Sequence, residues 1–192
     1  MRRLFAAIPV TPAPPLLALM QQGEAVLGSG SVRWANPQQM HLTLKFFGSV
    51  PESQIPDIAR HLQECAGCTA PFRFVLRGTG IFGSRYQPRV LWAGTSEDAP
   101  LRQLGEAVLA AATAAGFPRE RLPFVPHLTL ARIARSPSRK ILQNFMNLHH
   151  DAYLQEVDTP ALYLYESRLH TTGAEHLVLE KFLLMPPQMN QP

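Results

Sequence analysis

Lysine, cysteine and long apolar runs are all scarce in this chain of 192 residues. Its two cysteines, Cys65 and Cys68, are too few for the disulfide network that holds small secreted domains together. No segment approaches the roughly 18 uninterrupted apolar residues of a membrane-spanning helix. The apolar run Leu4–Val10 follows two arginines, but it is too short for a signal peptide and leads into a proline-rich stretch. We therefore expect a buried first strand there, a cytoplasmic protein and no contact with a membrane.

Charged residues are also few, at 17%, whereas hydrophobic residues make up 46% of the chain. This balance supplies a sizeable core and excludes global disorder. A length of 192 residues suits one globular domain or two small lobes that share a core. We expect residues 1–192 to form a single domain.

The basic residues are almost all arginine, with fifteen arginines against three lysines. Together with fourteen acidic residues, they give the chain a formal net charge of +4. Arginine carries a planar fork of N–H donors that matches phosphate oxygens. This composition is compatible with an ordinary solvated basic surface. It is equally compatible with an anionic partner, among which phosphate esters and nucleic acids come first.

Helical and strand-like patterns alternate along the chain. Apolar residues recur at helical spacing over 16–27, 55–66, 101–115 and 141–148. Strand-like runs lie between them at 4–8, 41–47, 72–76, 90–93, 127–133, 161–165 and 176–184. A leading strand is thus followed twice by the order helix, strand, helix, strand, strand, which indicates an internal repeat.

The repeat is visible in the residues themselves. The tetrapeptide His-Leu-Thr-Leu occurs at 41–44 and again at 127–130, 86 residues later. Side chains alternate between the two faces of a strand, so His41 and Thr43 share one face while the leucines anchor the other in the core. The same holds for His127 and Thr129. If the two halves pack about a pseudo-twofold axis, two imidazoles and two hydroxyls converge on one small volume.

Two histidines and two threonines at one site are suited to acid–base catalysis on a phosphodiester. With usual pKa values near 6.5, one imidazole can be neutral and the other protonated at neutral pH. The neutral imidazole takes a proton from an attacking water, and the protonated one gives a proton to the leaving oxygen. The threonine hydroxyls donate hydrogen bonds to the nonbridging oxygens, where negative charge grows. In-line attack needs the acid and the base on opposite sides of phosphorus, as a twofold-related pair would lie.

Metal binding is the alternative chemistry for paired histidines. Neither His41 nor His127 has another His, Asp or Glu three or four residues away to complete a first shell, so we predict a site without metal or other cofactor. A separate short motif, His61-x-x-x-Cys65-x-x-Cys68, has the spacing to place three ligands on one helix face. Because the chain has no second cysteine pair, two cysteines at a helix end are favoured over a zinc site there.

The paired tetrapeptides resemble the signature of the two-histidine (2H) phosphoesterases. The segments around them and between them, VRWANPQQMHLTLKFFG, RVLWAG and GFPRERLPFVPHLTLAR, are similar to those of the bacterial RNA 2′,3′-cyclic phosphodiesterases, once called 2′-5′ RNA ligases. The likeness extends over nearly the whole chain. It implies an α+β fold with a bilobal, pseudo-twofold duplication, in which two antiparallel β-sheets form a central groove and the helices pack on the outside.

The resemblance also implies an activity, the metal-independent hydrolysis of a 2′,3′-cyclic phosphate to a 2′-phosphomonoester. By that likeness His41 is the proton donor to the leaving 3′ oxygen and His127 is the proton acceptor, while Thr43 and Thr129 bind the phosphate. The twofold symmetry of the motifs does not by itself assign this polarity.

The expected partners are RNA ends or small nucleotides that carry a 2′,3′-cyclic phosphate, and the protein is expected to be a monomer. Ligation through a 2′-5′ linkage is the same hydrolysis run backwards, so one site can support both directions. A module that uses the same groove to bind a nucleotide or an RNA end without turnover is the alternative from another class.

Two cations near the motifs are candidates for substrate binding. Strand alternation places Lys45 on the face of His41. Arg132, which the resemblance places at the phosphate, falls by the same count on the face of Leu128 and reaches the groove only if its strand bulges or ends first.

Aromatic residues near the motifs are candidates for stacking on a base. The glycine-rich, basic segment 77–89 contains Phe82 and Tyr86, which could stack while the segment binds phosphate. An ordinary hairpin loop explains its glycines equally well. Before the last strand, His176 stands where the family more often has an aromatic residue.

Overall fold

The computed structural model describes residues 1–28, 30, 32–84, 86–135, 137–170 and 173–186. Over these residues, the chain contains four α-helices and nine β-strands, which confirms the predicted α+β class. The strands are β1 (Arg2–Pro9), β2 (Val32–Trp34), β3 (His41–Val50), β4 (Phe72–Gly83), β5 (Pro88–Ser96), β6 (Leu128–Ile133), β7 (Tyr153–Thr159), β8 (Ala161–His170) and β9 (Gly173–Leu183). The helices are α1 (Pro14–Leu27), α2 (Ile55–Gly67), α3 (Ala99–Ala114) and α4 (Arg139–Leu148).

The strands form one antiparallel series in the order β7-β4-β5-β6-β3-β1-β8-β9, and the short β2 pairs with β6. At the middle of the series, β3 and β6 are joined by a single residue pair, Leu42 with Leu128. This junction separates two four-stranded arms. The two sheets expected around a central groove are therefore the two arms of one series, and the arms meet where the two His-Leu-Thr-Leu motifs meet.

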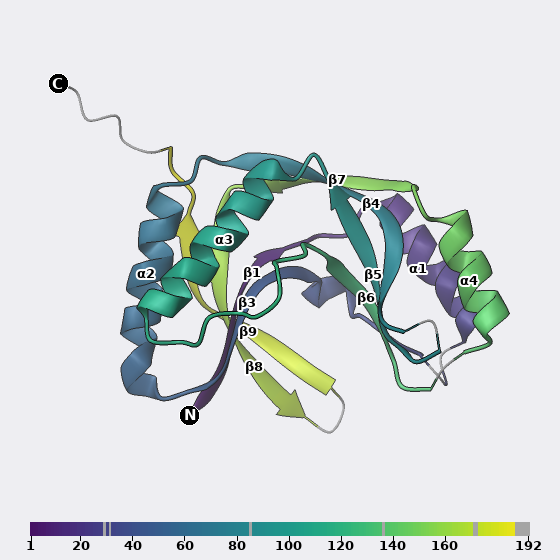
Figure 1. Ribbon diagram of the computed structural model, residues 1–192, viewed down its shortest axis with the longest axis horizontal. Coiled ribbons are helices and arrows are strands. Elements are labelled where there is room, and N and C mark those ends of the chain that lie inside the picture. Colours follow the sequence, from purple (N-terminus) through teal and green to yellow (C-terminus); the bar gives the residue numbers. More distant parts are fainter. Residues whose placement is uncertain (29, 31, 85, 136, 171–172, 187–192) are drawn as a thin grey trace.

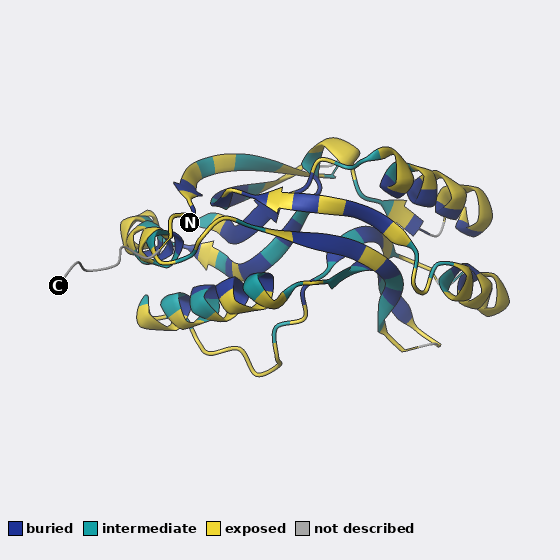
Figure 2. Ribbon diagram, turned by 90° about the horizontal axis from the view of Figure 1, so that it is seen from above, coloured by how far each residue is buried: buried dark blue, intermediate teal, exposed yellow. Residues whose placement is uncertain are grey.

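Each arm carries two helices and forms a lobe with them (Figure 1). In the His41 lobe, α2 and α3 pack against each other and contact β3, β8 and β9. In the His127 lobe, α1 and α4 pack against each other, and α1 contacts β2 and β7. The helix faces turned toward the strands are buried and the outer faces are exposed (Figure 2). The core thus lies between helices and strands, and the opposite face of the sheet is left open at the junction.

The lobes are not the two halves of the sequence. Strand β1 belongs to the His41 lobe, but the next helix, α1, packs in the His127 lobe, and β3 and α2 return to the His41 lobe. Helix α3 likewise follows two strands of the His127 lobe and packs in the other lobe. Each lobe therefore needs segments from both halves of the chain. Because neither lobe can form from one half of the chain alone, we still predict that residues 1–192 form a single domain.

All the predicted helices and strands are present, but sequence analysis missed β2 and β7 and ended β4 and β8 too early. Strand β7 lies at one edge of the series and carries charged residues on its exposed side. Two of them, Glu156 and Asp158, form ion pairs with Arg73 of β4. Such charges are typical of edge strands, and they weaken the hydrophobic pattern by which a strand is recognised.

The glycine-rich segment 77–89 is a hairpin formed by the ends of β4 and β5. At two of its glycines, a larger residue would clash with neighbouring atoms. A Cβ on Gly78, whose φ is +70°, would lie 2.4 Å from the carbonyl oxygen of His150. A Cβ on Gly80 would lie 2.2 Å from the ring of Trp92. Gly78 thus allows the hairpin to approach the segment before β7, and Gly80 allows close packing within the hairpin.

Candidate active site

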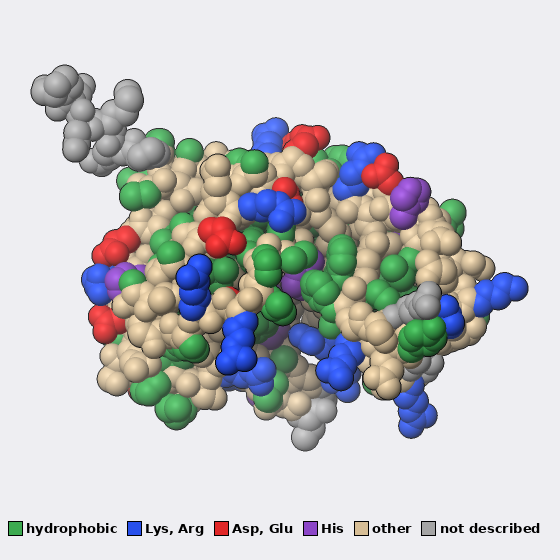
Figure 3. Space-filling view, viewed as in Figure 1, with side chains coloured by type: hydrophobic (Ala, Val, Ile, Leu, Met, Phe, Trp, Pro, Cys, Tyr) green, Lys and Arg blue, Asp and Glu red, His purple; other side chains and the backbone are tan. Residues whose placement is uncertain are grey.

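The two His-Leu-Thr-Leu motifs meet at the junction between the lobes. Leu42 and Leu128 pair there and are fully buried, so the histidine and threonine that flank each leucine turn to the open face. Extending the register by one residue places His41 across from Thr129. The two histidines are then diagonal neighbours, whose Cα atoms in a regular sheet lie roughly 7–8 Å apart. Figure 3 shows a hollow at this place, with histidine and basic side chains inside it.

A β-bulge lies at the last residue of each motif. The register between β3 and β1 skips Leu44, and the register between β6 and β5 skips Leu130. In β6 the two consecutive residues Leu130 and Ala131 are both fully buried, and the next residue, Arg132, is exposed. A bulge reverses the alternation beyond it, so Arg132 joins the open face on which His127 lies. The bulge that Arg132 needs to reach the groove is therefore present.

The equivalent bulge in β3 turns Lys45 away from the groove. Leu44 and Lys45 are both buried, and the ammonium group of Lys45, a residue only 6% exposed, is paired with the carboxylate of Glu120. The expectation that Lys45 shares the open face is not met, because alternation reverses at Leu44. Phe46 takes the position equivalent to Arg132 and is 51% exposed. Lys45 instead holds the segment that leads from α3 to the second motif.

The same backbone contact orients both histidines. His41 Nδ1 lies 2.8 Å from the carbonyl oxygen of Gln39, and His127 Nδ1 lies 2.9 Å from that of Val125. Because a carbonyl oxygen only accepts, Nδ1 is the donor in each case and Nε2 is left for a ligand. Nε2 can take a proton in the neutral ring and can give one in the charged ring. The geometry thus equips either histidine for either role.

Burial lowers the pKa of both histidines. It brings the pKa of His41 from its usual 6.5 to about 4, against a raising effect of the backbone hydrogen bond, and the charges of His176 and Arg132 lower it further. The pKa of His127 is lowered chiefly by burial and also by Arg132. Both imidazoles are therefore neutral at pH 7 until an anion binds. Usual pKa values would allow one ring to be neutral and the other protonated at pH 7. With the lowered pKa values, a ring becomes protonated only when an anion is bound nearby.

Arg132 is the common cation of the site. Its positive charge lowers the pKa of His41, His127 and His176, so its guanidinium lies within electrostatic range of all three rings. Within the part of the chain that the structure describes, no carboxylate forms an ion pair with Arg132. An anion bound among these groups would be stabilised by the guanidinium and would raise the pKa of each histidine.

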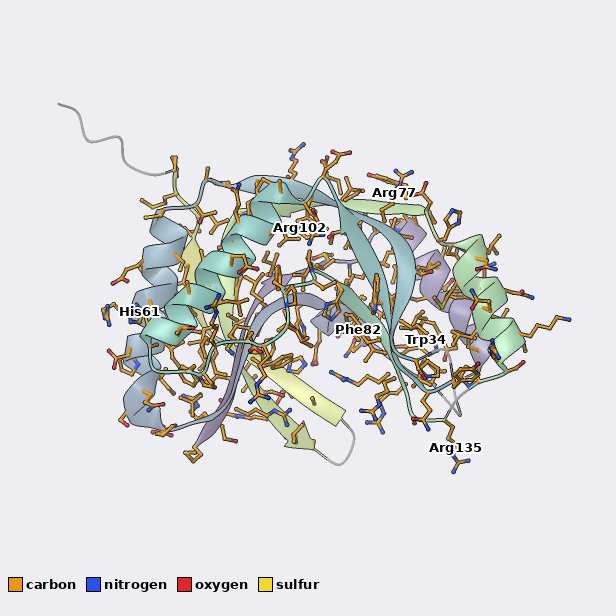
Figure 4. The ribbon with its side chains drawn as sticks, in the orientation of Figure 1. Trp34, His61, Arg77, Phe82, Arg102 and Arg135 are labelled. Carbon is orange, nitrogen blue, oxygen red and sulfur yellow. The ribbon has the colours of Figure 1, made fainter. Side chains whose placement is uncertain are left out.

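Phe82 and Tyr86, the two predicted stacking residues, differ in their positions. The ring of Phe82 meets that of His127 edge-on, with 4.6 Å between centroids, and Phe82 stands beside the central groove in Figure 4. Tyr86 lies at the turn of the hairpin, where the guanidinium of Arg139 is 4.9 Å from the centre of its ring. Arg85, next to it, lies outside the described residues. Phe82 is therefore placed at the motif, whereas Tyr86 is placed against α4.

Two rings that sequence analysis did not place at the site surround His41. The ring of Phe5 in β1 lies 4.8 Å from that of His41, and His176 in β9 meets His41 at right angles, 5.0 Å away. Burial lowers the pKa of His176 as well. Both residues are far from the motif in the sequence, so no local spacing signals them. The departure from the usual aromatic residue at position 176 was the one available hint.

A cavity of about 450 Å³ opens beside His41. It is lined by the end of β1, the segment before β3, and the side chains of Tyr165, His176 and Val178. This volume is in the range of small-molecule sites, and its position allows a nucleoside to lie next to His41. A second cavity, of about 530 Å³, lies along α3 and residues 119–123 and includes neither motif histidine.

In the motif His61-x-x-x-Cys65-x-x-Cys68, His61 lies on the outer side of α2, far from Phe82 in Figure 4, whereas Cys65 faces α3. Cys65 donates to the carbonyl oxygen of Ala107 at 3.4 Å, and burial raises the pKa of its thiol to about 11. Cys68 is exposed at the helix end. The described residues contain no group of three His, Cys, Asp or Glu side chains placed to hold a metal ion. The protonated Cys65 thiol is poorly suited to bind zinc.

Residues 13–169 match the sequence profile of the 2′-5′ RNA ligase superfamily. The chain belongs to this superfamily. Two similar proteins are each named RNA 2′,3′-cyclic phosphodiesterase. One, from Aquifex aeolicus, is 34% identical over 154 residues, which cover 79% of this chain and 81% of the relative. The other, from Thermus thermophilus, is 33% identical over 187 residues, which cover 95% of this chain and 90% of the relative.

Two solved structures share the fold of this chain. TT0787 of Thermus thermophilus matches with a TM-score of 0.76 and 30% identity, over 96% of this chain and 98% of that one. LigT of Escherichia coli in its apo form matches with a TM-score of 0.74 and 21% identity, over 95% of this chain and 97% of that one, and shows the fold alone. The resemblance to the 2H phosphoesterases is confirmed.

Proposed function

We propose that this superfamily member hydrolyses the 2′,3′-cyclic phosphate of RNA ends or small nucleotides to a 2′-phosphomonoester, by paired-histidine acid–base catalysis and without a metal. One observation carries the proposal. At the pair of Leu42 and Leu128, two histidines and two threonines share one open face with the guanidinium of Arg132. The names of the relatives from Aquifex aeolicus and Thermus thermophilus support the same reaction.

The reaction needs one displacement at phosphorus and two proton transfers. A water oxygen attacks phosphorus while Nε2 of His127 takes a proton from the water. The bond from phosphorus to the 3′ oxygen breaks as Nε2 of His41 gives that oxygen its proton, which leaves a 2′-phosphomonoester and a free 3′ hydroxyl. Hydroxyl groups of Thr43 and Thr129, with Arg132, stabilise the charge on the nonbridging oxygens. Exchange with solvent then returns both imidazoles to their starting states.

The backbone contacts of the two histidines are equivalent and do not tell donor from acceptor. We therefore take the roles, His41 as donor and His127 as acceptor, from the resemblance. A donor must be protonated before it acts, and the pKa of about 4 disfavours this at His41 in the free protein. The anionic substrate supplies the missing stabilisation when it enters between the rings. Substrate binding and protonation of the donor are therefore coupled in this scheme.

Non-catalytic binding of a nucleotide or RNA end in the same groove is the competing function. Hydrolysis of a 2′,3′-cyclic mononucleotide in excess chelator separates the two. We expect a 2′-phosphomonoester as the product, at a rate that the chelator does not change. Saturable binding without product would support the binding module, loss of turnover on chelation would show a metal requirement, and a 3′-phosphomonoester would refute the proposed leaving group.

The pH dependence of kcat/KM should reflect the lowered pKa values. This ratio reports the ionisation of the free enzyme, and the reaction needs one imidazole neutral and one protonated. We expect a bell with its maximum between about 4 and 6.5, falling about tenfold per pH unit above 6.5. The bell for kcat should lie at higher pH, because bound phosphate raises both pKa values. A kcat/KM that still rises at pH 8 would contradict the assignment.

The remaining expectations concern the setting of the reaction. Among the described helices, none has the length and apolarity to cross a membrane. A cytoplasmic location and a monomeric state stay predictions from the sequence, as does the reverse reaction, 2′-5′ ligation.

A further inference from the structure

A second arginine lies beside Arg132. Arg33 of β2 is its direct partner in the antiparallel register. Because β5 occupies one edge of β6, β2 pairs with the other edge, the one that meets β3 at Leu128. The neighbours of Arg33 in the strand, Val32 and Trp34, pack in the core, and Arg33 itself is exposed. Arg33 therefore turns to the open face, directly beyond the junction.

Two arginines in this arrangement repel each other. Residues directly opposite on one face have Cβ atoms about 4.5–5.5 Å apart, and like charges at that spacing are destabilising. Four other arginines of the sheet, Arg2, Arg73, Arg77 and Arg168, are paired with carboxylates, whereas Arg3 and Arg89 are not paired within the described part of the chain. Neither Arg33 nor Arg132 has such a partner among the residues described. The pair is suited to a ligand that brings two negative groups.

We infer that Arg33 binds the phosphodiester immediately upstream of the cyclic phosphate, and that the preferred substrate is accordingly the 3′ end of an RNA chain. This rests on the proposed function. The field of Arg132 reaches both motif histidines, which places it at the reacting phosphate. Arg33 lies on the neighbouring strand β2, directly across from Arg132. There it meets the next anion of the substrate, which in RNA is the phosphate on the 5′ side of the terminal ribose. A cyclic mononucleotide has no such group.

Three substrates isolate this contact. They are a 2′,3′-cyclic mononucleotide, a dinucleotide that ends in the same cyclic nucleotide, and that dinucleotide with an uncharged methylphosphonate linkage. Each is hydrolysed by the wild-type chain, by Arg33→Gln and by Arg60→Gln. The last variant removes the same charge from an exposed position of α2, outside the groove.

Arg33→Gln should raise KM for the charged dinucleotide about tenfold, the effect of one charge-assisted hydrogen bond, and leave kcat unchanged. It should not change the kinetics of the mononucleotide or the methylphosphonate. The slope of log KM against log salt for the charged dinucleotide should become shallower by roughly 0.7. Since the substitution also relieves a repulsion, the Tm should not fall. Arg60→Gln should behave as the wild type.

Two results would overturn the role of Arg33. An equal loss on all three substrates would place it at the reacting phosphate, and unchanged kinetics on all three would exclude the contact. Wild-type turnover of the mononucleotide reports on the proposed function separately. If the wild type hydrolyses none of the substrates, the proposed function fails and this inference fails with it.

Discussion

Replacing His127 or His41 with alanine is expected to lower kcat for a cyclic nucleotide by a factor of roughly 10²–10⁴, the usual contribution of one proton-transfer group. In each ring the backbone engages Nδ1 and leaves Nε2 for a ligand, and no other described histidine has the equivalent contact next to the junction. Removing both rings should cost little more than removing one, because acid and base act in the same transition state. Single-turnover kinetics with saturating substrate measure this effect.

His61→Ala is the matched control, since His61 lies on the outer side of α2 beside Glu64. It should keep full activity. His41 is packed among aromatic rings, so thermal unfolding of each variant, and the polar replacement His41→Gln, distinguish lost proton transfer from a lost fold. Folded His41→Ala and His127→Ala proteins that keep more than about a tenth of the wild-type kcat would refute the paired mechanism.

The same variants also decide the polarity of the pair. A 4-nitrophenyl phosphodiester has a leaving group that departs without a proton, so it does not need the acid. If His41 is the donor, His41→Ala should lose much less activity on this substrate than on the cyclic nucleotide, whereas His127→Ala should lose comparable activity on both. The opposite result would assign the donor role to His127.

Arg132→Gln is expected to lower kcat/KM by a factor of roughly 10²–10³, as for the loss of one group that stabilises transition-state charge. It should have a second effect of defined sign. The guanidinium lowers the pKa of His41 and of His127, so its removal raises both values and moves the basic limb of the kcat/KM profile to higher pH.

Arg132→Lys separates these two effects. The lysine keeps the positive charge but lacks the planar fork of donors, so it should lower the rate and leave the basic limb near its wild-type position. Arg60→Gln again controls for net charge. If Arg132→Gln moves neither the rate nor the pH limb, Arg132 does not act on the reacting phosphate or on the histidines.

Much of the candidate site could be predicted from the sequence because its signal is local. The duplicated tetrapeptide and the period of two in a strand are enough to separate His41 and Thr43 from their leucines, and the structure buries Leu42 as expected. The order of helices and strands follows from hydrophobic periodicity in the same way. Strand β7 was not predicted, because an edge strand buries only one side and the charged residues on its other side weaken the hydrophobic pattern.

The two bulges are a property of strand pairing that alternation along a single strand does not reveal. Nothing in the residues themselves shows that the register skips Leu44 and Leu130, because a skip is defined by hydrogen bonds to β1 and β5. Its consequence is large, since it exchanges the expected positions of two cations. Arg132 enters the groove, and Lys45 leaves it for Glu120.

The sequence by itself determined the class of the fold, the repeat and the two histidine–threonine pairs, since each depends on neighbours a few positions apart. Tertiary structure alone decided the surroundings of those pairs. Phe5 and His176 come from strands remote in the chain and set the burial around His41. Arg33 is close to His41 in the sequence, but only the pairing of β2 with β6 places it beside Arg132. A pKa depends on all the atoms within a few ångströms, so it is known only when distant segments have been brought together.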